Sequence, residues 1–278
     1  MPPSQHSRIS PSSLERTILC PPSLLLNEQY PDEETKYTAE GTTAHAVSEL
    51  ALYSKFNLKN PPDAKKVIDG VTGEMFVHAM QYAEFVKKRI DRIATDTECS
   101  ASDFQVFPEL TVHLDQYIPG CYGTSDCAIT SPERIAVIDY KYGVNRVPAQ
   151  GSDLLKEKFN YTANVQLSAY ALGVFSTLPS YRQKEINLIE IYIYQPRAKG
   201  GTYVGGMGIR PQTLVSFAGT MKKQVDLALV GGGEKCAGSH CRFCKHKAKC
   251  PEYLVTAASG NLYQSKIPNK FIDDIDGV

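Results

Sequence analysis

Residues Ala136–Lys141 read A-V-I-D-Y-K, an apolar run that ends in an aspartate, a tyrosine and a lysine. A short run of branched apolar residues predicts a buried strand. A second predicted strand, Tyr122–Thr130, carries Asp126 in the stretch G-T-S-D-C-A-I. Adjacent antiparallel strands would bring Asp126, Asp139 and Lys141 to one place in the fold.

Two carboxylates and an ammonium group are a useful set for one kind of chemistry. Oxygen ligands of this type hold Mg²⁺ or Mn²⁺ together with waters, and a bound cation can activate a water for attack on a phosphodiester. The alternative for each acid alone is an ordinary solvated residue at the end of a strand. The joint pattern favours a catalytic metal site.

The remaining elements predict a mixed α/β core, a central sheet flanked by helices. The expected helices are 42–58, 72–90, 161–175 and 211–229, and the expected strands are 104–114, 122–130, 135–140, 186–194 and 202–209. A short helix within Leu14–Leu26 should be interrupted at Cys20-Pro21-Pro22, since proline stops helices. We expect an N-terminal segment over residues 1–40, a catalytic core over 41–230 and a cysteine-rich module over 231–278.

Bulk properties indicate an ordinary globular protein. The 278 residues include 30 Lys and Arg against 30 Asp and Glu, so net charge does not announce a nucleic-acid partner. No apolar run is long enough to span a membrane, and the N-terminus lacks a secretory signal. We therefore expect a cytoplasmic protein, in which the eight cysteines are ligands or small apolar residues and not disulfides.

The cysteines crowd toward the C-terminal part of the chain. Cys241-x2-Cys244-x5-Cys250 has the spacing of a metal or cluster site. From spacing alone, the fourth ligand could be Cys236 or Cys20.

Four further residues accompany the acidic pair. Gln166 and Tyr170 are four residues apart on a predicted helix, and so lie on one face. His45 lies on the first long helix, and Glu109 lies on the strand that precedes Asp126. Gln166 and Tyr170 could touch the substrate or orient Lys141, and we include both among the expected catalytic residues. Taken singly, they would instead form a polar contact between helix and sheet, and His45 would be a structural histidine.

In this order, the motifs resemble those of the PD-(D/E)XK nuclease superfamily, in its RecB-like exonuclease branch. That family shows a helical His, a G-x-x-D strand, a (D/E)-x-K strand and a Q-x-x-x-Y helix. The matching positions are His45, Gly123–Asp126, Asp139–Lys141 and Gln166–Tyr170. The resemblance implies a restriction-endonuclease-like core and a Mg²⁺- or Mn²⁺-dependent deoxyribonuclease.

The resemblance also implies a role for each residue. Asp126 and Asp139 would bind the divalent ion, with the carbonyl of Tyr140 and the side chains of His45 and Glu109 completing the shell. Lys141 would orient or deprotonate the attacking water.

One subset of these nucleases is similar to this chain in its cysteines. The AddB nuclease domain and the CRISPR-adaptation nucleases have one cysteine before the core and three after it. This resemblance implies that Cys20, Cys241, Cys244 and Cys250 bind a [4Fe–4S] cluster. Zinc remains the alternative, and we expect His240 and His246 to be exposed neighbours, either able to replace a thiolate.

DNA is the partner that the resemblance implies, with a phage-type single-strand-binding or annealing protein beside it. Basic residues that could contact phosphates form three groups: Lys87, Lys88, Arg89 and Arg92; Lys156 and Lys158; Arg242, Lys245, Lys247 and Lys249. The alternatives are a structure-specific endonuclease, a cysteine-metal redox protein and a non-catalytic iron–sulfur or zinc protein that binds nucleic acid.

Overall fold

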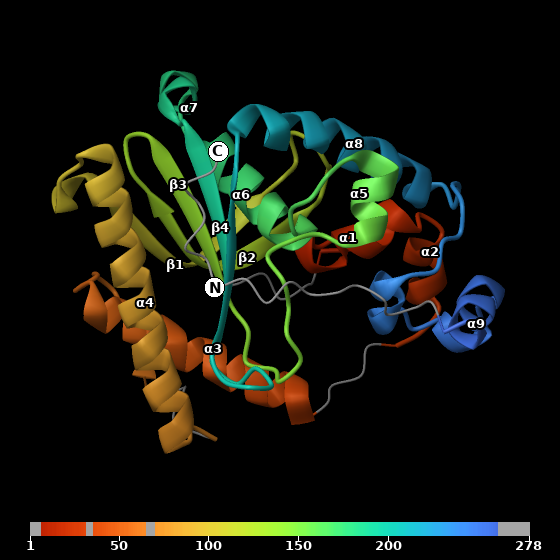
Figure 1. Cartoon of the computed structure of the whole chain (residues 1–278), viewed down its shortest axis with the longest axis horizontal. Helices are drawn as coiled ribbons and strands as arrows, with labels where there is room; N and C mark the ends of the chain where they lie inside the picture. The colour runs from red at the N-terminus through yellow and green to blue at the C-terminus, as the bar shows by residue number, and fades with distance from the viewer. Residues whose placement is uncertain (1–6, 32–35, 65–69, 261–278) are drawn as a thin grey trace.

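The computed structural model describes residues 7–31, 36–64 and 70–260, and its centre is one mixed sheet (Figure 1). The five strands lie in chain order, β1-β2-β3-β4-β5. They are β1 (Gln105–His113), β2 (Tyr122–Thr130), β3 (Arg134–Tyr140), β4 (Leu188–Gln195) and β5 (Tyr203–Ile209). Helices flank this sheet, so the predicted α/β fold class is confirmed.

The direction of β3 relative to its neighbours decides where the predicted site lies. β1, β2 and β3 form an antiparallel meander, whereas β3 and β4 run parallel, with Asp139 paired to Ile193. β5 returns antiparallel to β4. Because β3 and β4 are parallel, both end at the same edge of the sheet, where Tyr140 and Lys141 leave β3.

Helices cover both faces of the sheet. The chain forms α1 (Pro11–Leu19), α2 (Ser23–Glu28), α3 (Lys36–Lys55), α4 (Gly73–Thr97), α5 (Asp153–Phe159), α6 (Val165–Thr177), α7 (Ser180–Glu185), α8 (Pro211–Leu229) and α9 (Pro251–Ala258). The 3₁₀ turns that can be placed in full within the described ranges are η2 (Ala101–Asp103), η3 (Ser239–Phe243) and η4 (Lys247–Lys249). Buried residues of α3 and α4 pack on one face, and those of α1, α6 and α8 pack on the other.

Local sequence signals set several helix ends. Thr72 caps α4 by accepting a hydrogen bond from the backbone N–H of Met75 at 3.2 Å. α1 ends at Leu19 and α2 begins at Ser23, so the predicted break at Cys20-Pro21-Pro22 is confirmed. Pro211 opens α8, where its missing N–H costs no hydrogen bond.

The N-terminal helices share the main core. Leu14 of α1 and Leu24 of α2 belong to the same buried cluster as α6. The expected boundary between residues 40 and 41 falls inside α3. The division into three segments therefore coincides with no break at that point, and it remains a prediction.

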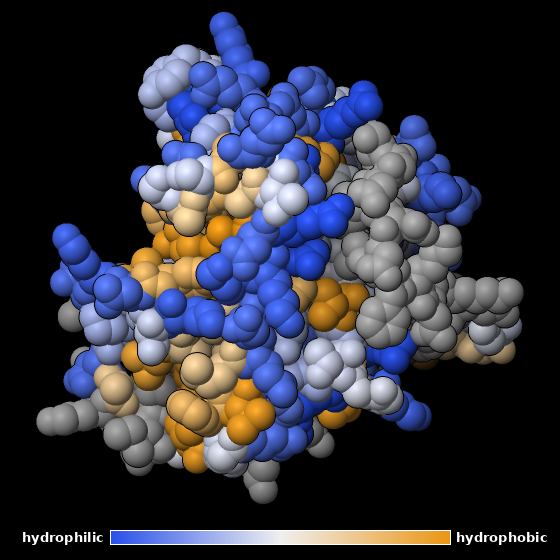
Figure 2. All heavy atoms as spheres, turned by 60° about the vertical axis from the view of Figure 1, so that its left-hand side comes forward, coloured by the Kyte–Doolittle hydropathy of each residue, from blue (hydrophilic) through white to orange (hydrophobic). Residues whose placement is uncertain are grey.

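The α4 side of the molecule has an apolar exterior as well as an apolar interior. Phe76, Val77 and Met80 on α4 are exposed by 58%, 51% and 40%. Figure 2 shows this side, with hydrophobic patches lying open among hydrophilic side chains. None of the helices in the described ranges is both long and apolar enough to cross a membrane.

α6 lies unusually close to the sheet because of one glycine. A Cβ placed on Gly173 would lie 2.6 Å from Cβ of Val112 on β1, a distance that real side chains do not reach. Gly219 on α8, by contrast, has no atom within 4 Å of such a Cβ.

We predict that the same substitution has opposite effects at these two helical glycines. Gly173→Ala should lower the free energy of unfolding by about 1–3 kcal/mol, because the methyl group overpacks the helix–sheet contact. Gly219→Ala should raise it by about 0.4–1 kcal/mol, because alanine restricts the unfolded chain and favours helix. Urea unfolding of both variants measures the two changes, and equal effects would contradict the packing argument.

Candidate active site

Two acids face each other on neighbouring strands. Glu109 on β1 and Asp126 on β2 lie between the register pairs Pro108–Cys127 and Leu110–Ser125. Glu109 has a positive φ of 45°, a conformation that is rare for residues other than glycine. Such strained residues persist where the surrounding structure holds them, often at functional sites.

Asp126 is buried and held at both carboxylate oxygens. Its Oδ2 accepts a hydrogen bond from the backbone N–H of Tyr140 at 2.6 Å, and its Oδ1 lies 3.0 Å from Nδ1 of His45 on α3. Burial alone would raise the pKa of Asp126, but His45, Lys141 and the Tyr140 N–H together lower it. Asp126 is therefore an anion that two elements orient.

His45, Glu109 and Asp126 form a group with the geometry of a metal site. One ligand atom from each lies within 4.8 Å of the others, the only such group found among the described residues. Burial works against the charge on His45, but Asp126 raises its pKa to about 9. Burial and the charge of Asp126 raise the pKa of Glu109 to about 8. At neutral pH both hold protons that a cation would have to displace.

The second half of the site surrounds Asp139 at the end of β3. Lys141 Nζ donates to Asp139 Oδ1 at 3.2 Å and to Gln166 Oε1 at 3.4 Å, and Gln166 Nε2 donates to the Tyr170 hydroxyl at 3.2 Å. Gln166 and Tyr170 thus lie on one face of α6 and contact each other, and Gln166 also contacts Lys141. The Lys141 backbone N–H donates to the Tyr194 carbonyl at 2.9 Å, which fixes the lysine against β4.

One oxygen of Asp139 has room for a further partner. Its Oδ2 lies 2.9 Å from Lys141 Nζ but is buried without a partner in hydrogen-bonding geometry. Burial raises the pKa of this carboxyl, and the ammonium of Lys141 opposes the rise. A buried carboxylate oxygen of this kind is a suitable ligand for a cation.

Tyr140 separates the two halves of the site. Its ring packs between Tyr82, at a centroid distance of 4.8 Å, and His45, at 5.8 Å, on the α3 and α4 face. Its N–H is committed to Asp126, as described above. The role expected for its carbonyl as a metal ligand remains a prediction.

Sequence reasoning missed Glu49. This residue lies one turn after His45 on α3 and lines the same open pocket as His45 and Glu109. Burial raises its pKa. The spacing H-x3-E on a helix was the available signal, since residues four apart share a face.

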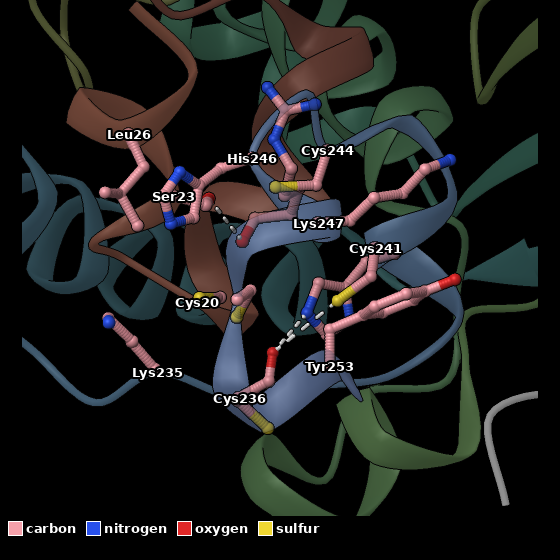
Figure 3. A pocket seen from close by; sticks show the side chains of 13 residues that line it. Cys20, Ser23, Leu26, Lys235, Cys236, Cys241, Cys244, His246, Lys247 and Tyr253 are labelled. Carbon is pink, nitrogen blue, oxygen red and sulfur yellow. Dashed lines mark hydrogen bonds between the residues drawn. The ribbon is translucent and has the colours of Figure 1, made fainter. Parts of the chain in front are cut away.

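A separate pocket gathers cysteines from both parts of the chain (Figure 3). It is lined by Cys20, Cys236, Cys241, Cys244 and Cys250. Burial raises the pKa of Cys20, and the nearby sulfurs of Cys244 and Cys250 raise it further. In Figure 3 the sulfur of Cys236 points away from those of Cys20 and Cys241.

Positive and donor groups surround these sulfurs. Asn27 Nδ2 donates to Cys244 Sγ at 3.3 Å. The Arg16 guanidinium is close enough for the charges of Cys244, Cys20 and Cys241 to raise its pKa, although burial lowers it overall. Arg16 Nε is buried without a hydrogen-bond partner. This environment suits a negatively charged occupant ligated by thiolates.

The expectation of an exposed His240 is wrong. His240 is 8% exposed, and its Nε2 lies 2.9 Å from the Cys236 carbonyl. Burial lowers its pKa to about 4, so the ring is neutral. Its turn packs against α1, which a local pattern of glycine, serine and histidine does not reveal.

The basic residues of α4 are not a free positive surface. Lys87 pairs with Asp91 one turn later, and Arg92 pairs with Asp96 at 3.1 Å. Arg89 lies over the rings of Phe85 and Tyr192, at 5.3 and 5.7 Å. The α4 group is therefore a weak candidate for contacts with phosphates.

Comparison with known proteins gives one family and two distant structures. The model of the family DUF2800, described as a protein of unknown function, matches residues 6–274. The fold is similar to a putative exonuclease from Eubacterium rectale, at 13% identity and a TM-score of 0.41, over 86% of this chain and 87% of that one. It is also similar to the protein SSO0001, at 12% identity and a TM-score of 0.32, over 87% and 95%. At this level of similarity, function must be inferred from the side chains of the site.

We predict that Mn²⁺ binding releases protons and strengthens with pH. At pH 7.5 His45, with a pKa of about 9, and Glu109, with a pKa of about 8, both hold protons. Roughly one to two protons should leave when the ion binds, and affinity should rise with pH until about 9. Calorimetry in buffers of different ionisation enthalpy counts these protons. Glu109→Gln should release about one fewer, and a pH-independent affinity would exclude these ligands.

Proposed function

We propose that this chain, which belongs to the DUF2800 family, is a deoxyribonuclease that depends on a divalent metal and acts as an exonuclease at DNA ends. One observation carries the proposal. Asp126 lies in the middle of β2 and Asp139 near the end of the neighbouring strand β3, and Lys141, two residues after Asp139, is hydrogen-bonded to it. Few other chemistries need two carboxylates and a lysine in this arrangement.

The residues present fit a divalent cation. Asp126, with His45 and Glu109 in their deprotonated forms, offers one ligand atom each. Asp139 stands outside this group of three, and it offers its Oδ2, which makes an ion pair with Lys141 but no hydrogen bond. Glu49 lines the same pocket and can bind through a water. A bound Mg²⁺ or Mn²⁺ supplies Lewis acidity, which lowers the pKa of a water and neutralises charge on the phosphate.

Lys141 is the residue that acts on the attacking water directly and not through the metal ion. Its ammonium donates hydrogen bonds to the Asp139 carboxylate and to the side-chain oxygen Oε1 of Gln166, so its direction is fixed. In the proposed reaction it orients the water that attacks phosphorus and stabilises the added negative charge. The water oxygen forms a bond to phosphorus, one ester P–O bond breaks, and the leaving oxygen departs as an alcohol. Tyr170 keeps Gln166 in place through its hydroxyl.

The resemblance extends this proposal to the biological setting. It favours end processing in recombination, in the cytoplasm, beside a single-strand-binding or annealing protein of phage type. A structure-specific endonuclease would use the same side chains. A non-catalytic protein would have no need of the complete set.

We expect Asp139→Asn and Lys141→Gln to reduce cleavage of linear DNA in Mg²⁺ by at least about 100-fold, the contribution of one positioned group in such chemistry. Asp226→Asn is the matched control, because Asp226 lies on α8 and pairs only at the surface with Lys222. Circular dichroism and melting temperature show whether each variant is folded. Full activity of either site variant would contradict the assignment of Asp139 and Lys141 to catalysis. Cleavage of circular DNA would indicate an endonuclease.

The cysteine pocket is a second part of the proposal. We assign it a [4Fe–4S] cluster held by Cys20, Cys241, Cys244 and Cys250. A single tetrahedral zinc would need sulfurs roughly 3.8 Å apart, from Zn–S bonds near 2.3 Å. Among the described residues no three cysteine sulfurs lie within 4.8 Å of one another, so their positions give no support to a single zinc ion. Its role is structural, since hydrolysis transfers no electron.

We predict different outcomes for two cysteine variants. Protein purified without oxygen should be brown with about four irons per chain. Cys20→Ser should lose the colour and the iron and melt at a lower temperature, whereas Cys236→Ser should keep both. Iron analysis and visible absorption measure the difference. If Cys236→Ser loses the colour and iron while Cys20→Ser keeps them, Cys236 is the fourth ligand. If the purified protein contains zinc and no iron, the pocket binds a single zinc ion and not a cluster.

A further inference from the structure

The turn between Cys241 and Cys244, in the cysteine module (residues 236–250), carries an aromatic ring that is exposed to solvent. Phe243 is 73% exposed, although it lies between Cys241 and Cys244, which are 6% and 9% exposed. An exposed phenylalanine loses the free energy that burial would give. A ring kept in solvent by a tightly folded turn suggests an interaction surface.

The backbone around Phe243 holds the ring in a fixed direction. The Cys244 N–H donates to the Cys241 carbonyl at 3.0 Å, which closes a tight turn. Arg16 on α1 donates from its NH1 to the Phe243 carbonyl at 3.2 Å. The guanidinium of Arg242 lies 5.2 Å from the ring centroid. A planar cation and an aromatic ring are thus presented together.

The same segment concentrates positive charge. Residues 239–250 contain Arg242, Lys245, Lys247 and Lys249 and no acidic residue, in a chain whose net charge is zero. Lys249 Nζ also lies over the Tyr30 ring at 5.6 Å, which adds a second aromatic beside the basic group. On α4, in contrast, Lys87 and Arg92 are paired with acids on their own helix.

We infer that this surface, made of Tyr30, Arg242, Phe243 and the three lysines, binds single-stranded DNA by stacking a base on Phe243. The inference rests on the proposed function, because it names the form of DNA that reaches the site. Single-strand sites combine cationic grooves with aromatic rings on which unpaired bases stack. Bases in a duplex are already stacked on each other, so a protruding ring has no free face to meet.

α1 connects this surface to the active site. At its N-terminal end, a Cβ placed on Gly123 of β2 would lie 2.7 Å from Cδ of Pro11. Gly123 precedes Asp126 by three residues on β2. Five residues further along α1, or about 8 Å at 1.5 Å per residue, Arg16 contacts the Phe243 turn. The Phe243 turn and the strand that carries Asp126 are thus both in contact with α1.

The test measures binding of a labelled strand of about 20 thymidines in metal-free buffer, where no cleavage occurs. Phe243→Ala should weaken binding roughly tenfold, the effect of losing one stacked base, and Phe243→Trp should restore it. Tyr181→Ala is the matched control, because Tyr181 is an aromatic residue exposed by 67% on α7, outside the cysteine module. It should bind like the wild type. Thiol and iron content confirm that each variant keeps its cysteine pocket.

Two further probes identify what Phe243 recognises. An abasic strand should bind the wild type and Phe243→Ala equally, since it offers no base to stack. Lys249→Ala should reduce the slope of log affinity against log salt by roughly 0.7, the value for one phosphate contact on a single strand. Vesicles containing phosphatidylserine should not compete with the strand.

The inference is overturned if Phe243→Ala binds the thymidine strand as tightly as the wild type, if the loss is equal on the abasic strand, or if vesicles bind in a Phe243-dependent way while the strand does not. Cleavage of linear DNA in Mg²⁺ tests the proposed function separately. If the wild type cleaves DNA but its binding of the strand does not depend on Phe243, only the inference about this surface is overturned. If the wild type does not cleave DNA but its binding depends on Phe243, only the proposed nuclease function is overturned.

Discussion

The hydrogen bond from the Tyr140 backbone N–H to the Asp126 carboxylate is the constraint on which the site depends. The backbone pairing of β2 with β3 ends at Cys127 and Ile138, and two residues further along β3 the N–H of Tyr140 donates to the side-chain oxygen of Asp126. Asp126 is thereby fixed between His45 on one side and the strand of Asp139 on the other. This bond keeps the Asp126 carboxylate beside the strand that carries Asp139.

Burial and charge then set the protonation of the site without a metal. Asp126 stays ionised because His45 and Lys141 are cationic neighbours, while the pKa values of Glu109 and Asp139 rise because both carboxyls are poorly hydrated. Too many acids share one poorly solvated region for all of them to ionise unaided. A divalent ion would relieve this conflict by replacing protons, so the site is compatible with a bound divalent metal.

Much of the fold followed from local patterns in the sequence. Apolar runs located all five strands, and Pro211 and the residues after Leu229 defined α8 at both ends. The short helices α5 and α7, of seven and six residues, are too brief for a periodic signal. The site residues could be named because chemistry limits which side chains bind metal. How these residues are arranged in space, and that Glu49 lies among them, could not be predicted, because both depend on how α3 packs against β1.

Other features depend on contacts between segments that are distant in the sequence. The burial of His240 arises where η3 meets α1. The sequence of α4 predicts a positively charged patch. In the structure Lys87 and Arg92 form ion pairs with acids on the same helix, and Arg89 lies over two aromatic rings. Exposure of Phe243 is equally invisible to a local pattern, because an aromatic beside cysteines is usually buried.

The cysteine pocket also imposes an order on biosynthesis. Its walls come from α1 and α2, which the ribosome makes early, and from residues after Lys235, which follow all five strands. The wall that α1 and α2 form is therefore completed only after the last strand and α8 have been synthesised. A chain that ended before Lys235 would contain every carboxylate of the candidate site and still lack the far wall of this pocket.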